Sequence, residues 1–373
     1  MNKVKVAIVR CERYDKELVY QAVKRGIELI GGIKSIVKEN ERILLKVNCL
    51  VGKKPEEAVT THPSILNAMI NILQENKVIV SYGDSPGFGK PETELKLSGF
   101  TDVAERHGVK LGDFEKGWAI DAPNGIECKK FHIANACLET DGIISLSKMK
   151  THQLTRITGA VKNQFGCVYG LHKTSFHMKI PNPTNFSKML VDLSALLRPR
   201  LYIMDGVVAM QGNGPSGGTP VHMNCIIIST DPIAVDSTFC RMINLDPAQV
   251  PTIKYGKTAK LGTYDLEEIE YVGEPLADFM NIEFDVLRKP VSNNLWKSFL
   301  PRPIRNAIYS KPVIDPAICV RCGVCISVCP VEGKALNFKY SKKDPPVYNY
   351  NKCIRCYCCQ EMCPHKAISV KGH

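Results

Sequence analysis

The sequence lacks a hydrophobic run of the kind that crosses a membrane. No stretch approaches the roughly 20 consecutive apolar residues that a spanning helix needs, although hydrophobic residues make up 44% of the chain. The first residues, Met1–Val9, alternate like a strand and have neither the long apolar segment nor the small-residue cleavage site of a signal peptide. We therefore expect a cytoplasmic protein without membrane contact.

Familiar nucleotide-binding signatures are missing as well. The segment Gly83–Gly89 lacks the terminal Gly-Lys-Ser/Thr of a phosphate-binding P-loop, and no Gly-x-Gly-x-x-Gly follows the first predicted strand. A nicotinamide cofactor is therefore not indicated, whereas a flavin stays open because flavin sites often have no compact motif. No recognised nucleic-acid-binding motif is present either, which disfavours a nucleic-acid partner.

Acidic residues are absent from one long stretch, Gly142–Val191, although the chain has 37 of them. Basic residues of this stretch are Lys148, Lys150, Arg156, Lys162, Lys173, Lys179 and Lys188, and its histidines are His152, His172 and His177. Charge of one sign repels itself unless something anionic lies within it. The stretch therefore predicts a binding site for an anionic small molecule.

Residues 1–289 alternate between strand and helix patterns. Short β-branched runs predict strands at Val4–Val9, Ile43–Val47, Val78–Ser81, Ile143–Leu146, Leu201–Met204 and Cys225–Ser229. Apolar spacing of three to four residues predicts helices at Leu18–Val37, Ser64–Glu75, Asn185–Leu197 and Pro232–Ile243. This alternation predicts an α/β domain whose mainly parallel sheet is covered by helices on both faces.

Polar side chains follow several of these predicted strands. In parallel α/β sheets, ligands bind beyond the carboxyl ends of the strands, so we expect these side chains to form one cationic rim. The candidate substrate-binding residues are Lys46, Asn48, Asp84, Ser85, Lys148, Lys162, Asn163, Asp205 and Asn213. The candidate catalytic residues are His152, His177 and Lys150, since histidine titrates near neutrality and reduction of an organic group needs protons.

Cysteine is plentiful, with 16 residues, of which nine lie between Cys319 and Cys363. Two runs have the spacing Cys-x2-Cys-x2-Cys-x3-Cys-Pro, which is the signature of bacterial two-cluster ferredoxins and not of two separated zinc-binding Cys-x2-Cys pairs. In that signature the fourth cysteine of each run binds the other cluster. The first 4Fe-4S cluster should use Cys319, Cys322, Cys325 and Cys363, and the second should use Cys353, Cys356, Cys359 and Cys329. Cys358 is left without a role.

These patterns divide the chain into three parts. Residues 1–289 form the α/β domain, and residues 290–312, which contain four prolines, are a linker. Residues 313–373 resemble the bacterial 2[4Fe-4S] ferredoxins over their whole length and should form a small α+β domain. Because this tail has little apolar content, its clusters should supply much of its stability.

The larger domain resembles the uncharacterised family called domain of unknown function 362. The resemblance covers roughly residues 40–240 and is carried by segments that include Lys46-Val47-Asn48, Gly83–Gly87, Lys148–His152, Thr158–Asn163, Met204–Gly206, Gly212–Pro215 and Asp231–Asp236. Asn48-Cys49 after Lys46-Val47 is a small departure from the expected pattern. The resemblance implies the domain layout, since members often carry a ferredoxin tail, but it names no reaction.

Two functions fit these observations. In the first, the tail receives low-potential electrons from a redox partner such as reduced ferredoxin and passes them to an anionic substrate in the α/β domain. Lys148, Lys150 and Lys162 would then bind the anion. In the second, the chain only transfers electrons, and its basic surface docks an acidic redox partner. We favour the oxidoreductase.

Overall fold

The computed structural model describes residues 3–170, 172–289, 304 and 309–372. Most of the linker expected at residues 290–312 lies outside these described residues. Its last residue, Pro312, belongs to strand β12 (Lys311–Ile314) of the C-terminal domain.

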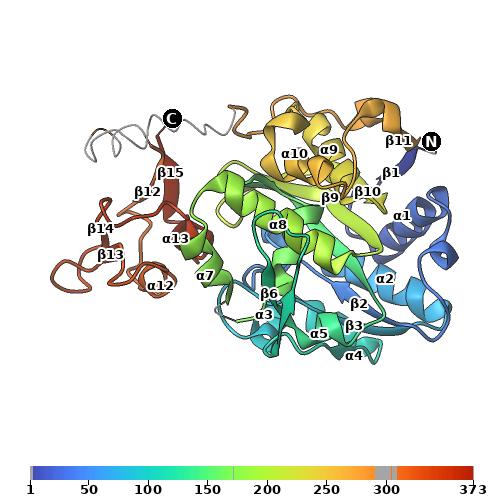
Figure 1. Cartoon of the computed structure of the whole chain (residues 1–373), viewed down its shortest axis with the longest axis horizontal. Coiled ribbons are helices and arrows are strands. Elements are labelled where there is room, and N and C mark those ends of the chain that lie inside the picture. The colour runs from blue at the N-terminus through green and yellow to red at the C-terminus, as the bar shows by residue number, and fades with distance from the viewer. Residues whose placement is uncertain (1–2, 171, 290–303, 305–308, 373) are drawn as a thin grey trace.

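Within the described residues, nine strands form one central sheet in the order β11-β1-β10-β9-β7-β2-β3-β4, with β8 paired to β7 (Figure 1). Five neighbouring pairs are parallel, and β10 is antiparallel to both β1 and β9. The mainly parallel sheet predicted from the sequence is therefore confirmed. The strands are β1 (Val4–Arg10), β2 (Arg42–Lys46), β3 (Ile79–Gly83), β4 (Lys110–Leu111), β7 (Gly142–His152), β8 (Arg156–Thr158), β9 (Leu201–Gln211), β10 (Thr219–Ser229) and β11 (Ile269–Gly273).

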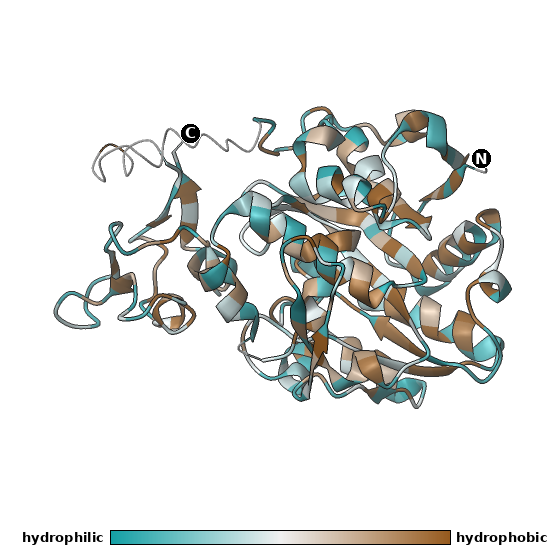
Figure 2. Cartoon of the chain, viewed as in Figure 1, coloured by the Kyte–Doolittle hydropathy of each residue, from teal (hydrophilic) through white to brown (hydrophobic). Residues whose placement is uncertain are grey.

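Helices cover both faces of this sheet because successive strand residues point to opposite sides. In β1, for example, Ala7 and Val9 belong to one hydrophobic core, while Val6 and Ile8 belong to the other. One core is closed by α1 (Lys16–Leu29), α2 (Pro63–Glu75), α3 (Pro91–Leu97) and α4 (Phe100–Arg106). The other is closed by α6 (Ala160–Asn163), α8 (Pro183–Leu197), α9 (Pro232–Met242) and α10 (Pro251–Thr258). Figure 2 shows hydrophobic residues along the strands between these layers.

Several predicted elements have different ends in the structure, among them the strands predicted at Leu201–Met204 and Cys225–Ser229, which are longer. The helix expected at Leu18–Val37 ends at Leu29, because Gly31 and Gly32 adopt φ angles of 121° and 83° that no helix contains. The strand expected to end at Leu146 continues to His152. Its extension is paired with β8, with Lys150 opposite Thr158 and His152 opposite Arg156. Lys148 and Lys150 therefore lie in a strand and not in a loop.

The remaining elements of the α/β domain lie at its margin. Strands β5 (Gly117–Asp121) and β6 (Lys130–Ala134) form a separate antiparallel pair, and α5 (Asn135–Leu138) follows β6 directly. Helix α7 (His172–Lys179) comes after the short helix α6 and lies beside the C-terminal domain (Figure 1). No helix in the described ranges is long and apolar enough to cross a membrane.

The C-terminal domain is small and built from short elements. They are β12, α12 (Val324–Ser327), β13 (Leu336–Asn337), β14 (Val347–Tyr348), α13 (Cys358–Glu361) and β15 (Ile368–Lys371). Strands β12 and β15 pair antiparallel, as do β13 and β14. Four of the eight residues in its small buried core are cysteines, which agrees with a domain stabilised by clusters.

Helix α13 docks this domain on loops at the carboxyl edge of the sheet. The Gln360 side-chain amide donates to the carbonyl oxygen of Asn213 at 2.8 Å, and the Ser216 hydroxyl donates to the carbonyl oxygen of Glu361 at 2.5 Å. The Asn213 amide donates to the carbonyl oxygen of Ile368 at 2.9 Å. The loop after β9 therefore holds the ferredoxin domain against the region where a ligand is expected.

Candidate functional site

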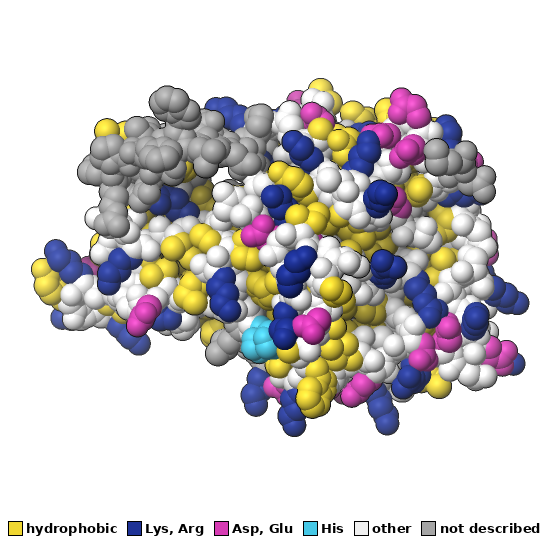
Figure 3. All heavy atoms as spheres, viewed as in Figure 1, with side chains coloured by type: hydrophobic (Ala, Val, Ile, Leu, Met, Phe, Trp, Pro, Cys, Tyr) yellow, Lys and Arg dark blue, Asp and Glu magenta, His cyan; other side chains and the backbone are white. Residues whose placement is uncertain are grey.

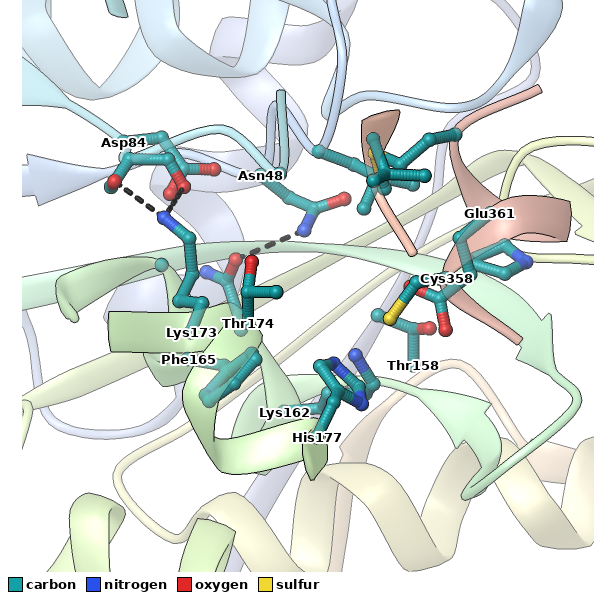
Figure 4. Close-up of a pocket in the computed structure, with 18 of the residues that line it drawn as sticks. Asn48, Asp84, Thr158, Lys162, Phe165, Lys173, Thr174, His177, Cys358 and Glu361 are labelled. Carbon is teal, nitrogen blue, oxygen red and sulfur yellow. Dashed lines mark hydrogen bonds between the residues drawn. The ribbon is translucent and has the colours of Figure 1, made fainter. Parts of the chain in front are cut away.

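A cavity lies between the carboxyl edge of the sheet and helix α13 (Figure 4), and together with its opening to solvent it encloses about 740 Å³. Loops after β2 and β3, the end of β7 and helices α6 and α7 supply one side, and the ferredoxin domain supplies the other. Its polar lining residues are Asn48, Asp84, Ser85, Lys150, Thr158, Lys162, Asn163, Lys173, Thr174, His177, Cys358 and Glu361. Its apolar lining residues include Leu50, Phe165, Pro215, Val328 and Met362.

A buried ion pair forms the floor of the cavity. The Lys46 ammonium group lies 2.8 Å from Oδ1 of Asp84, and Oδ2 of Asp84 accepts the backbone N–H of Cys49 at 2.7 Å. Asn163 ties this floor to its neighbours, since its Oδ1 accepts from Asn48 at 3.2 Å and its Nδ2 donates to Ser145 at 2.9 Å. Lys46 thus supports the cavity from behind, whereas Asn48, Asp84 and Asn163 line it.

Two further lysines line the cavity, and their ammonium groups donate hydrogen bonds to uncharged oxygens. The Lys173 ammonium group donates to the carbonyl and hydroxyl oxygens of Ser85 and to the carbonyl oxygen of Val168. The Lys150 ammonium group donates to the carbonyl oxygen of Val59 at 2.6 Å. Burial lowers the pKa of each lysine to about 7, so both exchange protons near neutral pH.

Several buried polar groups in the cavity have no partner within the described part of the chain. No hydrogen bond or ion pair holds the Lys162 ammonium group, which lies 5.7 Å from the centroid of the Phe165 ring. The hydroxyl of Thr158, Nδ1 of His177 and Oδ1 of Asn48 also lack hydrogen-bond partners. Leaving such groups unpaired costs roughly 1–3 kcal/mol each, and Figure 4 shows Thr158, Lys162 and His177 close together. This corner is suited to an anionic ligand.

Glu361 of α13 brings the one carboxylate that faces this corner from the ferredoxin domain. Nδ1 of His152 accepts the backbone N–H of Leu154 at 3.0 Å, so the ring proton lies on Nε2, 3.1 Å from Oε1 of Glu361. Burial acts to raise the pKa of Glu361, but His152 and Lys162 outweigh it and hold that pKa below its usual range. His152 lies behind Glu361 and does not line the cavity.

Besides Lys46, three of the predicted binding residues lie outside the cavity lining. The Lys148 ammonium group lies 2.8 Å from Oδ2 of Asp205, and the Tyr14 hydroxyl donates to Oδ1 of Asp205 at 2.8 Å. Neither Lys148 nor Asp205 is among the cavity residues, and both are fully buried. Asn213 also lies outside the lining because it binds Gln360 and Ile368 at the domain interface.

Seven predicted residues therefore meet in the cavity, and the structure adds others. The seven are Asn48, Asp84, Ser85, Lys150, Lys162, Asn163 and His177. Lys173 belongs to the acid-free stretch, but no sequence pattern distinguishes it from the other lysines there as a binding residue. Cys358 could be noticed in the sequence because it is a ninth cysteine beside two complete sets of four. Glu361 has no such sequence signal, because its position in the cavity depends on how the two domains pack.

The two predicted cluster sites correspond to two separate hollows in the C-terminal domain. One hollow, of about 340 Å³, is lined by Cys319, Cys322, Cys325 and Cys363. The other, of about 300 Å³, is lined by Cys329, Cys353, Cys356 and Cys359. Each set thus takes three cysteines from one run and one from the other, as the ferredoxin signature requires. The residues present fit a 4Fe-4S cluster in each hollow.

The second hollow lies next to the cavity. Cavity residues Val328 and Cys358 directly precede Cys329 and Cys359, which line that hollow. One stretch of backbone therefore carries residues of both linings. Cys358 lines the cavity and not the hollow.

Replacing Cys358 with alanine is expected to leave the iron content of the anaerobically reconstituted chain unchanged, because Cys358 lines neither hollow. Replacing Cys359 with alanine removes one of four ligands and should lower iron by about half. Iron and sulfide analysis with electron paramagnetic resonance of the reduced proteins measures both. Equal iron loss in the two variants would show that Cys358 is a ligand.

Comparisons with known proteins agree with this layout. Residues 43–241 match the model of the family described as a domain of unknown function (DUF362), and residues 311–364 match a 4Fe-4S dicluster domain, a type of domain that serves electron transfer. A thylakoid-associated protein of Synechocystis is 31% identical over 250 residues, covering 66% of this chain and 77% of that protein.

Two solved structures are similar in part. The lactate racemase apoprotein from Thermoanaerobacterium thermosaccharolyticum has a TM-score of 0.41 at 11% identity, covering 65% of this chain and 57% of that one. A Thermotoga maritima protein has a TM-score of 0.36 at 14% identity, covering 67% of this chain and 60% of that one. The chain therefore spans less than two thirds of either structure. The family matches decide the assignment: the chain belongs to the DUF362 family and carries a C-terminal 4Fe-4S dicluster domain.

Proposed function

We propose that this chain is an iron–sulfur oxidoreductase that reduces an anionic small molecule in the cavity beneath helix α13. The observation that carries this proposal is the composition of the cavity wall. Lysines from the α/β domain line one side, and residues adjacent in the chain to cluster cysteines line the other. A bound molecule would thus contact the anion-binding groups and the electron source together.

The anionic end of the substrate would bind at Lys162, Thr158 and His177. These groups are buried and make no hydrogen bonds through the atoms named above, so a carboxylate or phosphate would satisfy all three at once. Three lysines face two carboxylates around the cavity, and one of these carboxylates, Asp84, is already paired with Lys46. The positive excess favours an anion.

The reducible end of the substrate would lie toward Leu50, Val328 and Met362. These apolar side chains line the same cavity, and Val328 directly precedes Cys329 of the second hollow. An apolar, partly unsaturated group placed there would lie beside the backbone that carries Cys329. The substrate class is therefore a small organic acid or phosphate ester with an apolar reducible part.

When bound, the two clusters supply single low-potential electrons. Reduction of one double bond takes two electrons and two protons. The chain must donate one of these protons, and the other comes from solvent water. Burial lowers the pKa of His177 and His152 to about 4, which leaves both rings neutral at pH 7 and makes them weak proton donors. Lys150, with its pKa lowered to about 7, is better matched to that task.

The test uses the anaerobically reconstituted chain, reduced with dithionite and then desalted. Small unsaturated carboxylates and phosphate esters are added one at a time, and cluster reoxidation is followed by visible absorbance, with mass spectrometry of the product. We expect at least one compound to reoxidise the wild type about tenfold faster than the Lys162→Gln variant, a loss of about 1.4 kcal/mol, and to gain two hydrogens. The proposal fails if every active compound reoxidises the clusters of the wild type and of the Lys162→Gln variant at equal rates. If acidic redox proteins are then the compounds that reoxidise the two at different rates, the chain is an electron carrier without its own substrate.

A further inference from the structure

The first cluster site of the ferredoxin domain reaches the protein surface. Among the eight cysteines assigned to clusters, all of which the structure describes, Cys322 is the one classed as exposed. It lines the first hollow. Cavity residues Val328 and Cys358 directly precede cysteines of the second hollow, and Met362 directly precedes Cys363 of the first. Both cluster sites therefore adjoin the cavity, but the first also reaches solvent through Cys322.

Exposed apolar side chains surround the solvent-facing site. Ile318 and Val320 are 48% and 51% exposed, and Val320 also lines the first hollow together with Arg321. They lie on either side of Cys319 in the sequence. A protein docked beside this cluster site would bury both apolar side chains.

The same surface is positively charged. The Arg321 guanidinium group donates to the carbonyl oxygen of Lys343 at 3.4 Å, which places the segment 339–344 beside the first hollow. That segment carries exposed Lys339, Lys342 and Lys343 against one exposed acid, Asp344. Figure 3 shows several Lys and Arg side chains around the far end of this domain. A partner that complements this surface is acidic.

We propose that Ile318, Val320, Arg321, Cys322 and Lys343 form an electron-input surface that docks an acidic one-electron carrier protein. In each encounter the carrier is oxidised by one electron and the cluster held by Cys319, Cys322, Cys325 and Cys363 is reduced by one, with no proton transferred. Two encounters supply the electrons for one substrate reduction. The direction of flow rests on the proposed function, but docking itself does not require a substrate.

A protein carrier fits this surface better than a small reductant does. The charges and the apolar side chains are spread over two segments, residues 318–322 and 339–343, which is a wider area than a small reductant covers. Charged groups at the rim of such a contact act mainly on association rate and give a steep dependence on salt.

The test compares charge-reversed variants of the holo chain with a strongly acidic ferredoxin as the probe. The double variant Arg321→Glu/Lys343→Glu is expected to bind that ferredoxin at least about tenfold more weakly at low salt, a change typical of reversed rim charges. Calorimetry measures the affinity. The control is Lys34→Glu, which makes the same charge change as either single reversal, at an exposed lysine of the α/β domain, and should leave the affinity near that of the wild type.

Electron transfer is measured separately, without any substrate, as the ratio of the rate of cluster reduction by reduced ferredoxin to the rate by dithionite. Damage to the clusters would slow reduction by dithionite as well as by ferredoxin. A change in the ratio of the two rates therefore reports on docking of the ferredoxin alone. We expect the ratio to fall about tenfold in the double variant and to fall less in Arg321→Gln/Lys343→Gln. An unchanged ratio, or an equal loss in Lys34→Glu, would overturn the input surface while leaving the proposed reductase activity untouched.

Discussion

Replacing Lys162 with glutamine is expected to weaken sulfate binding to the holo chain by at least about tenfold. Lys162 is buried, lines the cavity and is held by no hydrogen bond or ion pair among the described residues. A buried charge-assisted hydrogen bond contributes roughly 1.5–3 kcal/mol, and a tenfold change in affinity corresponds to about 1.4 kcal/mol. Isothermal titration calorimetry measures the change. Sulfate is the probe because its charge stays constant near neutral pH.

Two variants distinguish an anion-binding role from a general effect of charge. Lys179→Gln removes a positive charge from the same acid-free stretch, but Lys179 is exposed and outside the cavity lining, so its sulfate affinity should match the wild type. Lys162→Arg keeps the charge and should retain most of the affinity. If Lys179→Gln loses as much affinity as Lys162→Gln, sulfate senses only net charge and the cavity is not its site.

The pH dependence of the same titration reports on the neighbouring lysines. Burial lowers the pKa of Lys150 and of Lys173 to about 7, so both lose protons as the pH rises from 6 to 8. The positive charge of the cavity then falls, and sulfate affinity should fall with it. In Lys150→Met one of these titrations is absent, and the slope against pH should become shallower. A flat profile in the wild type would show that neither lysine titrates in this range.

The sequence predicted the sheet because a sheet of this kind depends on short-range patterns, and the same patterns gave the candidate site at its carboxyl edge. Buried parallel strands are runs of β-branched residues, and polar residues after them must gather at one edge. The sequence did not predict which of the polar residues at this edge line the cavity. Lys148 and Lys150 are two residues apart in β7, yet Lys148 pairs with Asp205 while Lys150 lines the cavity.

The contribution of the ferredoxin domain was beyond the reach of sequence patterns. Glu361 reaches His152 from 209 positions further along the chain, and that contact exists because α13 docks on the loop after β9. The acid-free stretch, taken alone, predicts an anionic ligand as the counter-charge of its lysines. Part of its counter-charge is in fact supplied by Glu361, whose carboxylate raises the pKa of Lys162 against the effect of burial.

Replacing Asp205 with alanine is expected to lower the free energy of unfolding by about 3–5 kcal/mol, the typical cost of breaking a buried ion pair on one side. Asp205 is fully buried and accepts hydrogen bonds from Tyr14, from Lys148 and from the backbone N–H of His62. Its loss leaves the Lys148 ammonium group, which is 1% exposed, without a counter-charge. Urea denaturation followed by circular dichroism, with clusters intact at the start, measures the loss.

A double variant separates this structural role from the substrate-binding role that the sequence predicted for both residues. In Asp205→Ala/Lys148→Met the unpaired cation is gone, so the double variant should be more stable than Asp205→Ala alone, with a coupling energy of about 0.5–3 kcal/mol. Both variants should bind sulfate as tightly as the wild type, since neither residue lines the cavity. A loss of sulfate affinity comparable to that of Lys162→Gln, without the loss of stability, would instead place Lys148 and Asp205 in the binding site. The pair lies in β7 and β9, the two strands whose ends carry the cavity and the docking loop. The ion pair between Lys148 and Asp205 would therefore fix these two strands relative to each other without contacting the ligand.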